Sequence, residues 1–179
     1  MEHDSAHLLE QYIIGKDQDK YQILETIYEE SAEVECEINS TRITFPSNIV
    51  GNRDIAKILS ADFNKKYEKI KTYYLSKNIR CNFKILEQLW LVVMKKIGNE
   101  LTCVGTGYYN WKFRKNNNQI KIIKHKIYIH TMIELHDPES RQLKEIQETL
   151  EYPWVESHAA ISVLKRFGNL SDITKYLIK

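Results

Sequence analysis

The spacing of hydrophobic positions changes twice in the N-terminal part of the chain. Apolar side chains first recur at the interval of one helix face, which predicts two short amphipathic helices. Apolar and polar residues then alternate, and this period of two is typical of half-buried strands. Helical spacing returns after a turn at Pro46 and Gly51. The predicted elements are helices from Ser5 to Gly15 and from Asp17 or Asp19 to Tyr28, strands over 34–38 and 42–45, and a helix from Arg53 to Tyr74.

The central part of the chain predicts three long strands. Gly98-Asn99 tolerates positive φ and suits a hairpin turn, and the asparagines 116–118 suit a second turn. Gly105 and Gly107 interrupt the middle strand, which indicates a bend or bulge of the kind that a curved sheet needs. The three strands are expected over residues 83–97, 101–114 and 120–135.

The C-terminal residues are predicted to be helical. Pro138 suits the first turn of a helix that continues to Leu150, and two more helical segments follow. No repeat, low-complexity segment or flexible linker separates these helices from the rest of the chain. We therefore predict an α+β fold with a curved, mainly antiparallel sheet and N-terminal helices over residues 1–137. A C-terminal helical extension over residues 138–179 is expected to pack on it.

Composition and charge exclude several classes of function. Lys and Arg number 26 against 24 Asp and Glu, and the net charge of +2 is too balanced to indicate a nucleic-acid or membrane partner. The N-terminus lacks the apolar core of a signal peptide, and the longest apolar run, 89–94, is too short to cross a bilayer. Cys36, Cys81 and Cys103 have no Cys-x-x-Cys spacing, which predicts free thiols in a reducing, cytoplasmic compartment.

The order of these elements carries a resemblance. The chain has two helices, alternating strands at Val34–Ile38 and Arg42–Phe45, a third helix and then three long strands. This order resembles the start of the nuclear-transport-factor-two-like superfamily, which includes SnoaL-like and ketosteroid-isomerase-like proteins. The resemblance implies a conical α+β fold that encloses a pocket. It does not imply one reaction, because the superfamily hosts isomerases, dehydratases, cyclases and non-catalytic binders.

The asparagine-rich turn allows a prediction of strand register. If Lys115 pairs with Gln119, then Trp111 faces Ile123 and Tyr109 faces His125. One face of this hairpin then holds Tyr109, Trp111, His125, Ile127 and Ile129, and it is expected to face the helices. The other face holds Tyr108, Asn110, Lys112, Lys124, Lys126, Tyr128 and His130, and it is expected to face solvent or a partner.

Ketosteroid isomerases are the template for placing site residues by resemblance. Their pattern places Tyr12 near the helix-one tyrosine of the oxyanion hole, and Tyr109 at the position of the strand acid. Cys36 falls where these enzymes carry the carboxylate base. A cysteine of ordinary pKa in an apolar strand is a poor proton acceptor, so this chain departs from the family at the base.

His125 offers another catalytic arrangement. Opposite Tyr109 in the predicted register, it could act as general acid or base, with Tyr12 or Tyr109 as hydrogen-bond donor. Trp111, Tyr28 and Ile127 are the expected ligand contacts. The alternative is a core histidine that bonds to Tyr109 or to a carbonyl group. No cofactor or metal site is predicted, because His3 and His7 share a helix face without zinc-type spacing.

Three functions remain open at this level. The first is a pocket for a small apolar or carbonyl-bearing ligand, with or without lyase- or isomerase-like activity. The second is a homodimer or other protein–protein contact through the outer sheet face, centred on Tyr108 and Tyr128. The third, RNA binding by the same face, is opposed by the balanced charge. An open cavity with polar tips would favour a ligand, whereas a cavity plugged by apolar side chains would favour a scaffold.

Overall fold

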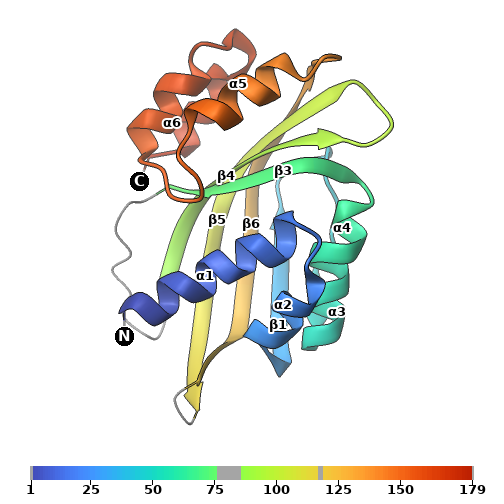
Figure 1. Cartoon of the computed structure of the whole chain (residues 1–179), viewed down its shortest axis with the longest axis vertical. Helices are drawn as coiled ribbons and strands as arrows, with labels where there is room; N and C mark the ends of the chain where they lie inside the picture. Colours follow the sequence, from blue (N-terminus) through green and yellow to red (C-terminus); the bar gives the residue numbers. More distant parts are fainter. Residues whose placement is uncertain (1, 76–85, 117–118, 179) are drawn as a thin grey trace.

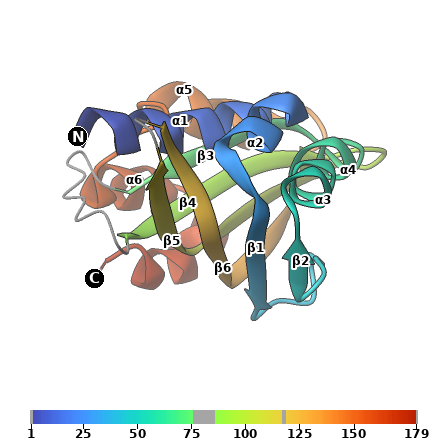
Figure 2. The same ribbon diagram turned by 90° about the horizontal axis from the view of Figure 1, so that it is seen from below.

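The computed structural model describes residues 2–75, 86–116 and 119–178. A six-stranded mixed sheet has helices on both faces (Figures 1 and 2). The N-terminal elements are α1 (Glu2–Asp17), α2 (Tyr21–Ile27), β1 (Tyr28–Ile38), β2 (Asn48–Val50), α3 (Asn52–Ala56), the π-helix η1 (Lys57–Ala61) and α4 (Asp62–Asn64). The long strands are β3 (Tyr67–Tyr74), β4 (Leu86–Lys96), β5 (Leu101–Asn116) and β6 (Gln119–His136). The C-terminal elements are α5 (Arg141–Thr149), α6 (Ser157–Leu164) and the 3-10 helix η2 (Gly168–Tyr176).

The strand order is β2-β1-β6-β5-β4-β3. All neighbours are antiparallel except β1 and β6, which run parallel, with Val34 opposite His125. This pairing brings β1, the first strand of the chain, beside β6, the last one. The predicted α+β class with a curved, mainly antiparallel sheet is therefore confirmed.

Three predicted elements are wrong. Arg42–Phe45 forms no strand, and β1 pairs instead with Asn48–Val50. The second helix ends one residue before Tyr28, which begins β1. The third helical stretch stops at Asn64, and Tyr67–Tyr74 is a strand paired with β4. Its aromatic and β-branched residues favour a strand, and pairing with β4 overrides the helical spacing.

The predicted hairpin register is wrong in its pairs but right in its faces. Asn116 pairs with Gln119 at the turn, one step from the predicted pairing, and a bulge at Lys112/Phe113 adds a second step. Trp111 therefore faces His125, and Tyr109 faces Ile127. A shift of one residue would move each side chain to the other face, but a shift of two residues keeps it on the same face. The residues predicted to face inward are therefore buried.

Gly107 marks a second bulge, as the sequence predicts. The register shifts between Thr106 and Gly107, and a Cβ atom at Gly107 would lie 1.8 Å from the carbonyl oxygen of Tyr128. Only glycine fits so close a backbone approach.

Alternation along β4 divides the interior into two cores. Trp90, Val92 and Met94 pack with the N-terminal helices, whereas Leu91 and Val93 pack with the C-terminal helices. The C-terminal elements, orange to red in Figure 1, thus cover part of the outer sheet face. The covered part holds Leu91, Val93 and Val104, whereas Lys112 and Lys124 of the predicted outward-facing set stay exposed.

The segment between α5 and α6 fastens the C-terminal elements to the rest. The backbone N–H of Tyr74 donates to the carbonyl of Pro153 (2.7 Å), and that of Val155 donates to the carbonyl of Tyr74 (2.9 Å), at the outer edge of β3. The Trp154 indole N–H donates to the Glu10 carboxylate of α1 (2.8 Å). The predicted start of β4 at residues 83–85 and the thiol of Cys81 lie outside the described residues.

Candidate functional site

Four aromatic side chains surround His125 in the interior. Its imidazole stacks on the Trp111 indole, with centroids 3.7 Å apart and planes 12° from parallel. The rings of Tyr12 and Tyr109 meet it edge-on at 5.2 and 5.0 Å. Its Nδ1 atom shares a 2.6 Å hydrogen bond with the Tyr28 hydroxyl. The structure thus brings together the three predicted catalytic residues, but the hydrogen-bond partner of His125 is Tyr28 rather than Tyr109.

Burial keeps this cluster uncharged. It lowers the pKa of His125 well below its ordinary value and raises the pKa values of Tyr12 and Tyr28 well above theirs. At neutral pH the imidazole and both phenols are therefore neutral. His125 Nε2 has no hydrogen-bond partner among the described residues.

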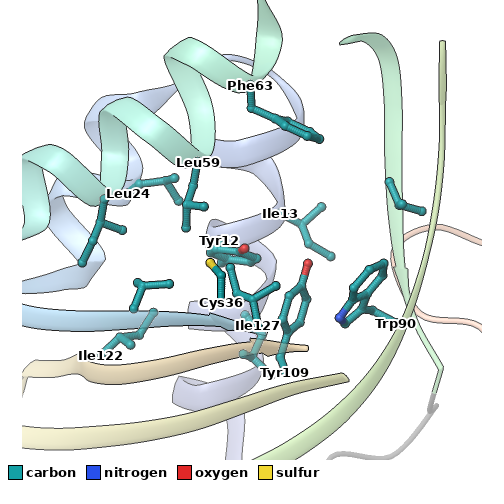
Figure 3. Packing of buried hydrophobic residues seen from close by; sticks show 14 of the residues in the cluster. Tyr12, Ile13, Leu24, Cys36, Leu59, Phe63, Trp90, Tyr109, Ile122 and Ile127 are labelled. Atoms are coloured by element: carbon teal, nitrogen blue, oxygen red, sulfur yellow. The ribbon is translucent and has the colours of Figure 1, made fainter. Parts of the chain in front are cut away.

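A small inner chamber lies between α1, η1, α4 and the sheet. Its volume is about 30 Å³, room for about one water molecule. Figure 3 shows the Tyr12, Tyr109 and Trp90 side chains in this region. The wall includes Tyr12, Lys16, Phe63, Trp90, Tyr109 and Ile127. Of the predicted site residues, Tyr12, Tyr109 and Ile127 line the chamber, whereas His125, Trp111 and Tyr28 lie outside its lining.

Two hydrogen-bond donors on the chamber wall have no partner among the described residues. They are the Tyr12 hydroxyl and the Trp90 indole N–H, on side chains that are 0% and 3% exposed. Burial is the main cause of the raised pKa of Tyr12, and the neighbouring Tyr109 hydroxyl raises it further. Buried polar atoms in proteins are nearly always paired. The Tyr73 hydroxyl and the Trp111 indole N–H, outside the chamber lining, also have no partner among the described residues, but Tyr12 and Trp90 are two such donors on the wall of one chamber.

A buried ion pair that the sequence analysis missed lies beside the chamber, with Lys16 on the chamber wall and Asp17 behind it. Lys16 Nζ lies 2.5 Å from Asp17 Oδ1 and donates to Thr72 Oγ1 at 2.8 Å. Asp17 Oδ2 accepts the backbone N–H of Thr72 at 2.6 Å. The signal was present, because Lys16 lies four residues after Tyr12 and thus on the same helix face. The predicted first helix ends at Gly15, whereas α1 continues to Asp17.

An aromatic plug separates the chamber from an outer vestibule of about 390 Å³. Ile43, Phe45 and Phe63 line both spaces, and the two phenylalanine rings stack at 5.8 Å. Arg42 and Lys66 lie on the vestibule wall. The irregular segment 39–47, part of which was predicted as a strand, therefore supplies two of the plug residues.

Cys36, which the resemblance to ketosteroid isomerases aligns with their carboxylate base, is unsuited to that role. It is buried, and burial together with the nearby Glu35 raises its pKa to about 12, so the thiol stays protonated at neutral pH.

Among the described residues, no group of three or more His, Cys, Asp and Glu side chains could hold a metal ion. Within the same ranges, no helix has the length and apolarity to span a membrane.

The uncovered part of the outer sheet face forms a second surface. A groove of about 620 Å³ runs over β1, β5 and β6. Two of its three lysines pair with glutamates of β1: Lys124 with Glu33 at 3.0 Å, and Lys126 with Glu37 at 2.7 Å. The rings of Tyr108 and Tyr128 stack at 4.9 Å beside them. At the far side, Tyr176 of η2 stacks on His130 and marks where the C-terminal cover ends.

Comparison with known proteins identifies the fold. No family model matches the sequence, and no curated protein matches it. A scytalone dehydratase-like protein from Novosphingobium aromaticivorans is similar in structure, with a TM-score of 0.59 and 13% identity over 78% of this chain and 93% of that one. A type 2 hexachlorocyclohexane dehydrochlorinase (LinA) has a TM-score of 0.60 and 14% identity over 74% and 87%. An isomerase-like protein from Bacillus subtilis has 0.53 and 11% over 72% and 87%.

These likenesses establish the nuclear-transport-factor-two-like, SnoaL-like fold for this chain. The resemblance inferred from the order of elements is confirmed at the level of fold. At identities this low, the likeness does not extend to a reaction.

Proposed function

We propose that this protein binds a small, mainly apolar molecule through a carbonyl oxygen in the inner chamber. The observation that carries the proposal is the pair of unpartnered donors, the Tyr12 hydroxyl and the Trp90 indole N–H, on the chamber wall. A buried donor without a partner costs about 1–3 kcal/mol, and a ligand oxygen would remove that cost. The high pKa of Tyr12 keeps its proton available for donation.

Ligand entry requires the plug to move. The chamber alone has room for about one water molecule, so the carbonyl end would enter it while the apolar body rests in the vestibule. Displacing Phe45 from Phe63 would join the two spaces. Phe45 lies in the irregular segment 39–47, whose ends are held to the sheet: the Asn39 N–H donates to the Ile129 carbonyl, and the Ser47 carbonyl accepts the Cys36 N–H, each at 2.9 Å. Apolar side chains fill the entrance of the unliganded chamber, and this feature alone would favour a non-catalytic scaffold. We prefer a ligand-binding function because two donors on the chamber wall have no partner among the described residues.

Binding is better supported than turnover. The similar structures include a dehydratase-like protein, a dehydrochlorinase and an isomerase-like protein, which gives lyase- or isomerase-like chemistry a precedent on this fold. None of the described residues on the chamber wall is His, Asp or Glu. His125, the predicted base, lies outside the lining. A proton-abstraction step therefore has less support than hydrogen bonding to a ligand.

Calorimetry with acetophenone, a small aromatic ketone, tests the proposal. Tyr12→Phe and Trp90→Phe each remove one donor while keeping a ring, and we expect each to weaken binding about fivefold or more. Tyr21→Phe is the matched control, because Tyr21 is 42% exposed on α2. Unchanged affinity in both chamber variants would count against the proposal.

We also propose a homodimer through the uncovered part of the outer face. Glutamates on β1 pair with lysines on β6 within one chain, so this face has little net charge to repel a second copy related by a two-fold axis. This pairing neutralises Lys124 and Lys126 and weakens the case for RNA. Sedimentation of wild type and Tyr128→Glu tests this: a shift from dimer to monomer supports it, and a monomeric wild type at micromolar concentration rejects it.

A further inference from the structure

We infer that the ligand group seated in the inner chamber is an uncharged carbonyl, as in a ketone, lactone or amide, and that Asp17 is the residue that excludes a carboxylate. The inference rests on the proposed function and names the class of ligand for the same site. It follows from the charges already buried around the chamber.

Asp17 already neutralises the chamber's cation. Lys16 and Asp17 are in contact at 2.5 Å, and their side chains are 8% and 1% exposed. Thr72 holds the carboxylate in place, because its backbone N–H donates to Oδ2 and its hydroxyl donates to Oδ1 at 3.0 Å. Tyr152 approaches Oδ2 from the segment between α5 and α6, at 3.4 Å. The pair is therefore fixed and electrically balanced before any ligand arrives.

Lys16 still has one N–H to offer. An ammonium group carries three donors, and the contacts to Asp17 and Thr72 use two of them. Its Nζ lies 5.1 Å from the centroid of the Phe63 ring, and both side chains line the chamber. A ligand oxygen can accept this remaining N–H together with the Tyr12 hydroxyl O–H or the Trp90 indole N–H.

Charge decides which oxygen fits. Lys16 is the one charged side chain among the described residues of the chamber wall. A carboxylate would place a second anion against one cation, leaving an uncompensated buried charge, which is costly in a low-dielectric interior. A carbonyl oxygen takes the same hydrogen bonds without adding charge. Arg42 and Lys66 belong to the vestibule, so this exclusion applies only to the inner end of the ligand.

Acetophenone and benzoate are matched probes, because they have similar size and differ in charge at the acceptor end. Calorimetry on the wild-type chain at pH 7 should show benzoate binding at least about tenfold more weakly than acetophenone. In Asp17→Asn, the Lys16 charge is left uncompensated, and the preference should shift toward benzoate by at least about tenfold. Glu139→Gln makes the same change in net charge at an exposed site and should leave the preference unchanged.

The outcomes separate the two claims. Benzoate binding as tightly as acetophenone to the wild type would overturn the inference and leave the proposed function standing. Failure of both probes to bind would overturn the proposed function and the inference with it. If melting shows that Asp17→Asn does not fold, Lys16→Met replaces it. That variant leaves Asp17 uncompensated, so the preference for acetophenone should rise, and an unchanged or lower preference would overturn the inference.

Discussion

Replacement of His125 by phenylalanine separates the core role of this residue from a catalytic one. The buried imidazole is neutral because burial lowers its pKa well below 6.5. In the unfolded chain the ordinary pKa of about 6.5 returns. As the pH falls below 6.5, the unfolded state takes up a proton that the folded state does not, so stability is lost on the acid side.

The magnitude follows from this linkage. Each pH unit below 6.5 removes about 1.4 kcal/mol until the folded pKa is reached, which amounts to about 2 kcal/mol between pH 7 and pH 5. His125→Phe keeps a ring against Trp111 but removes this titration. It also leaves the Tyr28 hydroxyl unpaired, which lowers stability by about 1–3 kcal/mol at both pH values.

Urea unfolding at pH 7 and pH 5 measures the difference. We expect the wild type to lose about 2 kcal/mol more than His125→Phe over this range. His158→Phe is the control, because His158 is exposed on α6. Equal pH dependence in wild type and His125→Phe would refute the burial argument. If His125→Phe instead abolished acetophenone binding while leaving stability unchanged, the residue would belong to the ligand site.

Three further predictions concern the fold. Gly107→Ala should lower the unfolding free energy by more than about 2 kcal/mol in urea titrations, whereas Gly168→Ala, with open space at its Cβ, should change it by less than about 0.5 kcal/mol. Asp137→Ala should cost about 2 kcal/mol at pH 7, because the carboxylate accepts from the backbone N–H groups of Arg141 and Leu143. Burial opposes the charged form of Asp137, but these hydrogen bonds lower its pKa. The stability that Asp137 contributes should therefore persist above about pH 4 and fade as the pH falls further. A chain that ends at His136 should aggregate in size-exclusion chromatography, because it exposes Leu91 and Val93 on the outer face.

The sequence predicted the order of elements well where local pattern and tertiary structure agree. The alternation around Trp111 and Tyr109 identified the inner face, and Gly107 identified a bulge. The segment Tyr67–Tyr74 was mistaken for a helix because its apolar spacing fits both periods, and only the partner strand β4 decides between them.

The candidate site was less predictable. Tyr12 and Tyr109 were found from the resemblance, and both line the chamber. Lys16 and Thr72 were missed because they are far apart in sequence and meet only when β3 packs against α1. The exclusion of His125 from the chamber also depends on packing, since alternation specifies a face of the sheet but not the depth at which a side chain lies beneath its neighbours.

The parallel pairing of β1 with β6 has a consequence for how the chain acquires its structure. Tyr28 and His125, which share a hydrogen bond, are 97 residues apart in the sequence. Contacts of such long range form late, because the entropy of closing a large loop opposes them. During synthesis, α1, α2 and β1 therefore emerge well before the strand that completes their environment. Until β6 is made, β1 has an open edge to which another chain could add, so the nascent protein is expected to depend on chaperones or on slow translation at this stage.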